Sequence, residues 1–190
     1  MAFELSVTKT PPKWDTLPVY LLRHYPYTSS SYKPLCEVRG ALYEGALYFR
    51  LTAYEWRFLP DTAPGQGSCI QLFLDGPLGT LVLTVEHGRP VNAVFMNGAQ
   101  EQTVSCPNPA QYSGEDNTGD FWGGNLTVPC ELLALAGLDK LQAGDTLSMN
   151  VTKVQWDSRA FHYGSLGKPV SPAPVPFDRG ALVRFTIADY

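Results

Sequence analysis

The chain has 190 residues, 44% of them hydrophobic, which is enough to bury the core of one domain. Only 17% of the residues are charged, against roughly 25% in an average globular protein, and the 17 glycines and 16 prolines favour many short strands joined by turns. A net charge of −4 without a basic stripe argues against a nucleic-acid partner, and no apolar run approaches the ~20 residues that span a bilayer.

The N-terminal 14 residues alternate polar and apolar side chains. They lack the basic start and the continuous apolar run of a signal peptide. As read, the chain is therefore expected in the cytoplasm, and an extracellular location stays open if a leader has been removed. No linker, internal repeat or low-complexity segment divides residues 1–190, so we expect a single domain.

A hairpin is the first predicted structure. Residues 36–43 and 47–54 each alternate apolar and polar side chains, which is the period of a strand with one buried face. Glu44-Gly45 lies between the two runs and predicts the turn. Three further strands over 69–75, 81–85 and 91–95 are separated by four-residue turns and predict a meander, and Asn97-Gly98 turns the chain towards Thr103-Val104.

The second half is predicted as a loop over 106–120, a strand over 121–129, a short helix over 131–138 and a strand over 146–154. A long irregular stretch from 156 to 180 precedes a last strand over 181–187. Eight to ten strands with one short helix cannot form a parallel sheet, which needs a helix at each crossover. The expected fold class is all-β, an antiparallel β-sandwich of the jelly-roll or immunoglobulin-like class with one short helix.

Metal and disulfide chemistry have weak support. Cys36, Cys69, Cys106 and Cys130 are too far apart for a zinc site, and we favour buried free thiols over two disulfides. Residues 116–120 (DNTGD) offer oxygen ligands that calcium could use, but such segments are more often solvated turns. We expect no cofactor.

Catalytic motifs are missing from the sequence. The three histidines His24, His87 and His162 are too far apart for a helical zinc pair, and the segments around Ser68 and Ser165 miss the G-x-S-x-G motif by one position. A ligand-binding protein is therefore the better hypothesis.

Aromatic residues near predicted strand ends indicate what the ligand could be. A sugar ring has C–H groups on its faces and hydroxyls at its edge, so aromatic planes with polar neighbours suit it. Tryptophans in a sandwich are more often core, and a lone histidine is usually structural, so both interpretations stay open. The predicted ligand-binding residues are Trp56, Arg57, Trp122, Asn125, Trp156, His162 and Tyr163.

Several stretches in order resemble the family 9 carbohydrate-binding modules, in the divergent single-domain form found in bacteria. They cover most of residues 20–187 and are LRHYPY at 22–27, YKP at 32–34, YFRL at 48–51, EW at 55–56, GSCIQLFLD at 67–75, FWGG at 121–124 through VP at 128–129, LL at 132–133, FHYGS at 161–165, and 174–185.

The resemblance implies a β-sandwich that recognises sugars through an aromatic clamp. The family commonly has a sugar-stacking tryptophan after the His-aromatic-Gly-Ser segment, where this chain has Leu166. Acidic positions beside Ser68-Cys69 are replaced by Gly67 and Gln71. Leucine has no flat polarised face, so the clamp must use another tryptophan or sugar binding is reduced.

Three functions follow as hypotheses. The first is non-catalytic binding of a saccharide or small polar ligand, linked to carbohydrate catabolism. The second is a retained fold that serves protein–protein interaction or another ligand, motivated by Leu166 and the apolar loop over 170–177. The third is an enzyme with two facing carboxyl groups among Glu55, Asp61, Asp75 and Asp120. The sugar and the oligomeric state do not follow from the sequence.

Overall fold

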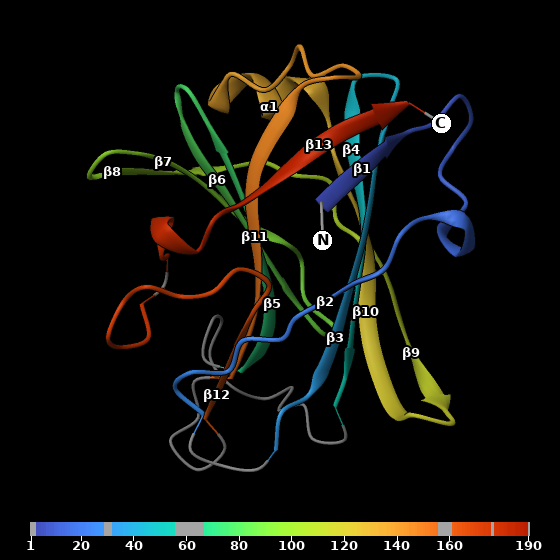
Figure 1. Ribbon diagram of the computed structural model, residues 1–190, viewed down its shortest axis with the longest axis vertical. Coiled ribbons are helices and arrows are strands. Elements are labelled where there is room, and N and C mark those ends of the chain that lie inside the picture. The colour runs from blue at the N-terminus through green and yellow to red at the C-terminus, as the bar shows by residue number, and fades with distance from the viewer. Residues whose placement is uncertain (1–2, 29–31, 56–66, 156–160, 176, 190) are drawn as a thin grey trace.

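Strands dominate the fold (Figure 1). The computed structural model describes residues 3–28, 32–55, 67–155, 161–175 and 177–189. In these ranges the strands are β1 (Phe3–Val7), β2 (Tyr20–Leu21), β3 (Leu35–Tyr43), β4 (Ala46–Tyr54), β5 (Ser68–Gly76), β6 (Gly79–Glu86), β7 (Asn92–Asn97), β8 (Gln100–Val104), β9 (Ala110–Asp116), β10 (Gly119–Val128), β11 (Thr146–Gln155), β12 (His162–Ser165) and β13 (Val183–Asp189). The helices are α1 (Cys130–Ala136) and the short 3-10 turns η1 (Trp14–Thr16) and η2 (Arg179–Ala181).

The predicted first hairpin is confirmed as β3–β4. Its strands pair from Leu35 with Tyr54 to Tyr43 with Ala46. Glu44 and Gly45 both have positive φ, 48° and 76°, which is the tight turn that matches the twist of a hairpin. The predicted meander is confirmed as β5–β6–β7, and β8 follows it as an edge strand.

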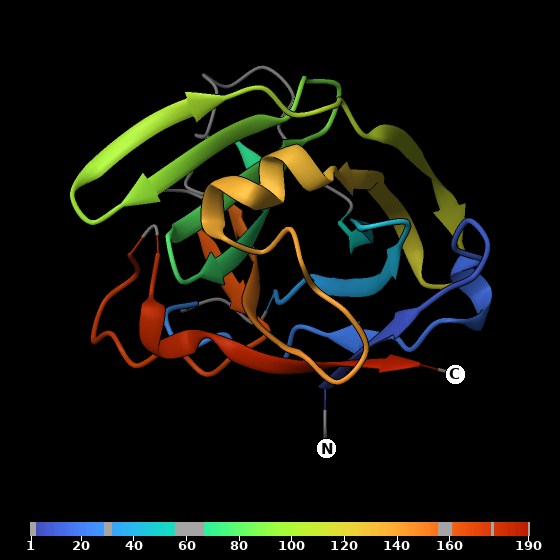
Figure 2. The ribbon, with the colours of Figure 1, turned by 90° about the horizontal axis from the view of Figure 1, so that it is seen from above.

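The strands form one curled sheet in the order β8-β7-β6-β5-β11-β13-β1-β3-β4-β10-β9, with β12 paired to β11 and β2 to β3. The curl brings β5–β8 to face β3, β4 and β10 across an apolar interior (Figure 2). Inward side chains from both layers, such as Leu51, Leu72 and Leu83, share one hydrophobic core. The expected all-β sandwich with one short helix is therefore confirmed.

The N-terminal strand β1 joins the two layers. It pairs in parallel with β13 over its whole length and with β3 through Ser6 and Val7. The other strand pairings of the described residues are antiparallel. A parallel neighbour comes from a distant part of the chain, so the local pattern does not reveal this partner.

The loop predicted over 106–120 is wrong in part, because Ala110–Asp116 form β9. This strand is polar and mostly exposed, so it lacks the apolar alternation that predicts a strand. Its backbone pairs with β10 instead, from Asp116 with Gly119 to Ala110 with Asn125. Asp116 Oδ1 accepts the backbone N–H of Thr118 at 2.7 Å, which closes the hairpin turn.

The helix α1 closes one end of the sandwich, at the top of Figure 1. Its Leu132 and Leu133 are buried against the core, and it ends at Gly137, whose φ of 73° suits a residue without Cβ. Among the described residues, no helix is long and apolar enough to cross a membrane. The opposite end of the sandwich is closed by polar side chains.

Candidate functional site

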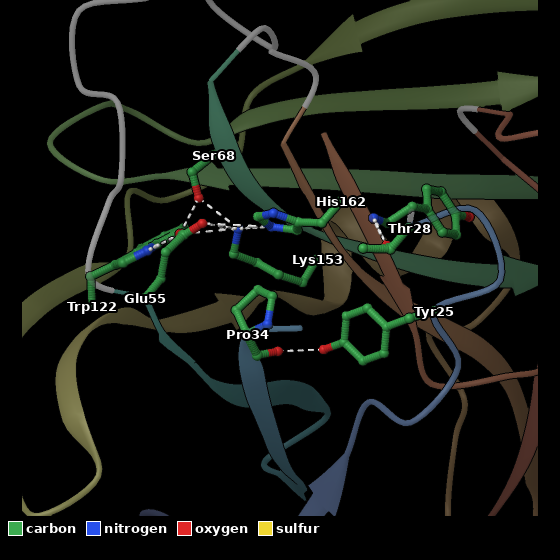
Figure 3. Close-up of polar contacts among 9 residues, drawn as sticks. Tyr25, Thr28, Pro34, Glu55, Ser68, Trp122, Lys153 and His162 are labelled. Carbon is green, nitrogen blue, oxygen red and sulfur yellow. Dashed lines mark hydrogen bonds and ion pairs between the residues drawn. The ribbon is translucent and has the colours of Figure 1, made fainter. Parts of the chain in front are cut away.

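Five polar side chains meet between the two layers at the end of the sandwich opposite α1 (Figure 3). We call Glu55, Ser68, Trp122, Lys153 and His162 the buried polar cluster. Glu55 and Trp122 come from the β4–β10 layer, and the other three come from the β5–β11–β12 layer. Their exposed fractions lie between 0% and 5%.

The period of the strands explains why these polar residues point inward. Leu47, Phe49, Leu51 and Ala53 face the core along β4, and Glu55 is the next residue of that row. On β11, Leu147, Met149 and Val151 face the core, and Lys153 follows them. Two rows of inward residues therefore end in opposite charges, a pattern in the sequence that could have identified both residues.

Glu55 is the acceptor around which the cluster is arranged. Its carboxylate accepts hydrogen bonds from the Ser68 hydroxyl and, at 3.0 Å, from Trp122 Nε1. Lys153 Nζ lies 3.2 Å from Oε1 and 3.1 Å from Oε2. A buried carboxylate is costly unless it is paired and hydrogen-bonded, and both conditions are met here.

Lys153 has an acceptor for each of its three N–H groups. Nζ donates to the Ser68 hydroxyl at 2.6 Å, to Glu55, and to His162 Nε2 at 3.0 Å. An ammonium group cannot accept, so this contact makes Nε2 the acceptor and leaves His162 as the neutral ring. His162 Nε2 also lies 3.5 Å from Glu55 Oε1, but the shorter contact to Lys153 decides its role. Lys153 also lies 5.8 Å from the centre of the Trp122 ring.

These contacts set the charge of the site. Burial alone would raise the pKa of Glu55, but the Lys153 ammonium and the hydrogen bonds from Ser68 and Trp122 hold that pKa below its ordinary value. Glu55 is therefore a carboxylate at neutral pH. It cannot donate a proton to a substrate, and its oxygens are already engaged.

A shallow groove of about 190 Å³ opens beside the cluster. Glu55 forms part of its floor, and its other lining residues include Tyr32, Lys33, Pro34, Tyr54, Thr118 and Asp120. We call it the end groove. Two aromatic rings, one cation and two carboxylates line this opening, and of the charged residues Lys33 and Asp120 are exposed while Glu55 is buried. That mixture offers a flat apolar contact together with donors and acceptors.

The segment before β3 is fixed to β12 by specific contacts. The Tyr25 hydroxyl donates to the Pro34 carbonyl, and Thr28 Oγ1 accepts the backbone N–H of Tyr163 at 3.2 Å (Figure 3). A Cβ at Gly164 would lie 2.6 Å from the Tyr25 ring, so the glycine is what allows the ring to pack there. This packing holds the approach to the end groove in place.

Comparison with protein-family models finds no match, and comparison with curated proteins finds none either. Solved structures do match. One is a protein of Bacteroides uniformis to which carbohydrate binding is attributed, 15% identical with a TM-score of 0.71, over 98% of this chain and 100% of that chain.

Another is a family 9 carbohydrate-binding module of Caldicellulosiruptor kristjanssonii, solved with cellotriose and with glucose. It is 12% identical with a TM-score of 0.62, over 98% of this chain and 94% and 96% of the two structures. This chain has the fold of a family 9 carbohydrate-binding module. The resemblance in the sequence motifs is thereby confirmed at the level of the fold, and the ligand has to be argued from this chain's own residues.

Within this module fold, two of the predicted site residues come together in the buried polar cluster. Trp122 and His162 are 0% and 1% exposed, so neither presents a ring to a ligand in this structure. For Trp122 the core interpretation is the right one, because it lies on the inward row of β10 with Leu126 and Val128. His162 has a structural partner in Lys153.

The other described site residues lie elsewhere. Tyr163 is 1% exposed and faces the opposite side of β12 from His162, where it packs with Cys69 and Val154. Asn125 is three residues from Trp122 along β10, so the two side chains point to opposite faces of the sheet. Trp56, Arg57 and Trp156 lie outside the described residues, and their ligand contacts stay a prediction.

Leu166 is almost fully buried in this chain. Its side chain is 4% exposed and belongs to the main hydrophobic core. Its backbone N–H donates to Val151 at 2.9 Å, which fixes it directly after β12. The leucine is therefore mainly a packing residue, and only its edge reaches a surface groove that Phe3, Tyr20 and His24 also line.

The proposed carboxyl pair of an enzyme receives no support from the described candidates. Asp75 lies seven residues along β5 from Ser68, roughly 23 Å at about 3.3 Å per residue. It interacts there with Thr80 and Arg179. Asp120 borders the end groove with Glu55, but Glu55 is buried in its ion pair. Asp61 lies outside the described residues.

The remaining reactive groups are the cysteine thiols and the possible metal ligands. The four cysteines are free, and burial raises the pKa of Cys36 and Cys69 to about 12, so both are inert thiols. Cys106 and Cys130 are half-buried rather than fully buried. In the described ranges no group of three or more His, Cys, Asp or Glu side chains is arranged to hold a metal ion.

Proposed function

We propose that this chain binds a saccharide without transforming it, and that the end groove is the binding site. The observation that carries the proposal is the end groove itself. It places Tyr32, Tyr54, Lys33 and Asp120 around one opening on a fold that sugar-binding modules share. Aromatic faces suit the C–H groups of a sugar ring, while the ammonium and carboxylate suit its hydroxyls.

The buried polar cluster supports this site from below. Glu55 lines the groove and is bonded to Ser68 and Lys153 of the opposite layer, so this part of the groove is held in place. A rigid site loses less entropy when a ligand binds. The cluster is therefore assigned a supporting role, and the groove residues the contact role.

The proposal excludes catalysis because of the state of Glu55. Glycoside hydrolysis requires a proton donor and a second carboxylate about 5 to 10 Å apart. Glu55 is ionised and 1% exposed, with its oxygens held by Ser68, Trp122 and Lys153. Among the described residues that line the groove, Asp120 is then the one remaining carboxylate, and it cannot supply both functions.

The alternative function, protein–protein interaction, was motivated by Leu166 and by the apolar loop over 170–177, and Leu166 now gives it little support. Leu166 is 4% exposed and contributes only an edge to a surface groove, so it offers little area to a partner. Val170 in the apolar loop is 69% exposed, so this loop is the observation that still favours a protein partner. One exposed valine is common on protein surfaces and identifies no partner.

The test is calorimetric titration of the full chain with glucose, cellotriose and other neutral oligosaccharides. Tyr54→Ala and Asp120→Ala should each weaken binding about tenfold, equivalent to about 1.4 kcal/mol. Tyr43→Ala is the matched control, because Tyr43 lies at the far end of the same hairpin. No binding across the panel, or equal binding by all three variants, would overturn the proposal. Sugar hydrolysis by the wild-type chain would overturn its non-catalytic part.

A further inference from the structure

A second groove lies on the outer face of the β5–β8 layer, away from the buried polar cluster. Its volume is about 180 Å³. The inward residues of these strands, such as Leu72 and Leu83, fill the core, so the groove is built from the alternate residues that face outward. Figure 1 shows the β7–β8 hairpin and the segment leading into η2 on the same side of the molecule.

The outward residues of this layer form bands across the strands. Gln71, Thr84 and Asn92 are direct cross-strand neighbours and make a polar row, in which Gln71 Nε2 donates to Thr84 Oγ1 at 3.3 Å. The next row, Phe73, Val82 and Val94, is apolar. Beyond it, Met96 pairs with Glu101 at the edge strand. The groove is thus an apolar strip with hydrogen-bonding groups on both sides.

An aromatic wall stands over the apolar strip. Phe177 stacks on Phe73 with ring centres 5.1 Å apart and planes 17° apart, and its side chain is half-buried where it borders the groove. The next residue, Asp178, is buried and accepts the backbone N–H groups of Val170, Ser171 and Gly180 at 2.8 to 3.0 Å. Three hydrogen bonds to one carboxylate therefore hold the segment that carries Phe177.

We infer that this outer groove is a second carbohydrate-binding site, which takes one sugar ring of a neutral glycan. Its banded floor matches an amphipathic ring: the C–H face lies on Phe177 and the apolar strip, and the hydroxyls reach Gln71 and Asn92 on one side and Glu101 on the other. The volume is below the roughly 300–1,000 Å³ of drug-sized pockets, which fits one ring rather than a buried chain.

Charge decides which glycans fit. Among the described residues that line the groove, Glu101 carries the one charge. A uronate or sulfate group would meet a carboxylate there and no cation, so an anionic glycan is disfavoured. The inference shares only the class of ligand with the proposed function, because the end groove and the outer groove have no lining residue in common.

Two sites on one chain would bind a long glycan more tightly than either site alone. Phe73 lies five residues along β5 from Ser68 at the cluster end, roughly 17 Å at about 3.3 Å per residue, and the end groove lies beyond Ser68 on the opposite layer. A polysaccharide chain that reaches both grooves gains effective concentration at the second one. Oligosaccharides too short to reach both would show two independent binding events.

The test is NMR titration of the full ¹⁵N-labelled chain with neutral trisaccharides: cellotriose, xylotriose, maltotriose and mannotriose. At least one should shift the amides around Asn92, Glu101 and Phe177. Phe177→Ala and the exposed Asn92→Ala should each weaken that response about tenfold, with shifts near Tyr54 and Asp120 unchanged. Gln102→Ala is the control, because it lies on the same edge strand with its side chain on the other face.

The two grooves are distinguished by where the shifts occur. Shifts confined to the end groove, or outer-groove shifts that survive both substitutions, would overturn this inference alone. Shifts confined to the outer groove would support it and overturn the proposed end-groove site. A trigalacturonate that binds the outer groove as tightly as the neutral sugars would overturn the charge argument and with it the neutral-glycan assignment.

Discussion

Lys153 and Glu55 carry opposite charges into a protein interior, where an isolated charge is destabilising. Their exposed fractions are 0% and 1%, and Ser68, Trp122 and His162 satisfy the remaining donors and acceptors. Such a pair adds little net stability compared with apolar residues of equal volume, but it is strongly destabilising to break. Its value here is geometric, since it holds two layers at one separation beneath the end groove.

The first prediction concerns Lys153→Met. The change leaves Glu55 buried without a counter-charge and should lower the free energy of unfolding by about 3–5 kcal/mol. The double variant Glu55→Gln/Lys153→Met should be more stable than the single one, because no unpaired charge remains. Urea denaturation measures both.

The exposed Lys168→Met provides the control for this pair and should stay within about 0.5 kcal/mol of the wild type. A loss below about 1 kcal/mol for Lys153→Met would contradict the assignment of a buried ion pair.

At the scale of a single element, β10 shows how glycines shape a sheet face. Gly123 leaves room for Tyr112, whose hydroxyl donates to the Leu51 carbonyl at 3.0 Å and contacts Thr52 at 2.8 Å. A Cβ at Gly123 would lie 2.1 Å from the Leu51 oxygen and 2.7 Å from the Tyr112 hydroxyl. The glycine is required by the close approach of the Leu51 carbonyl on β4 and of Tyr112 on β9, and its φ is not in the left-handed region.

The second prediction follows from that approach. Gly123→Ala should lower the free energy of unfolding by about 1–3 kcal/mol, because the backbone of β4 cannot move aside without breaking its pairing. Gly124→Ala should cost less, since its Cβ would first meet the Pro109 side chain at 3.0 Å. Thermal unfolding of the two variants compares them directly, and equal losses would show that the Leu51 carbonyl and Tyr112 do not lie as close to Gly123 as described.

Some elements could be predicted from the sequence and others could not. The β3–β4 hairpin and the β5–β7 meander have alternating apolar residues and turn signals, so local patterns suffice. The strands β9 and β12 were missed because their pairing partners, rather than their own patterns, make them strands, and β1 was missed although its residues alternate, because its partners β13 and β3 come from distant parts of the chain. Of the site, Trp122 and His162 were selected by residue type, while Glu55 and Lys153 meet only once two layers are stacked.

At the scale of the whole molecule, β1 connects the two layers through β13 on one side and β3 on the other. Leu5 at its centre is 1% exposed and packs into the shared core. Gly40 accommodates it, since a Cβ there would lie 2.5 Å from Leu5 Cδ2. The N-terminal strand is therefore part of the cooperative core.

The third prediction tests that role. Leu5→Ala should lower the free energy of unfolding by about 2–5 kcal/mol through the cavity it leaves. Leu135 on α1 is 38% exposed, so Leu135→Ala should change the free energy of unfolding far less. Chemical denaturation with fluorescence detection gives both values. Similar losses for the two variants would mean that β1 is not integral to the core.

The sequence by itself determined the all-β class, the main hairpins and the likeness to family 9 carbohydrate-binding modules, because strand period and turn chemistry are local properties. Only the tertiary structure decided that Trp122 is core, that Leu166 packs inward and that Asn125 faces away from Trp122. It also decided where the two grooves lie. Each of these features depends on which strands become neighbours and on which face of a strand meets the other layer. Contacts between residues far apart in the chain determine both.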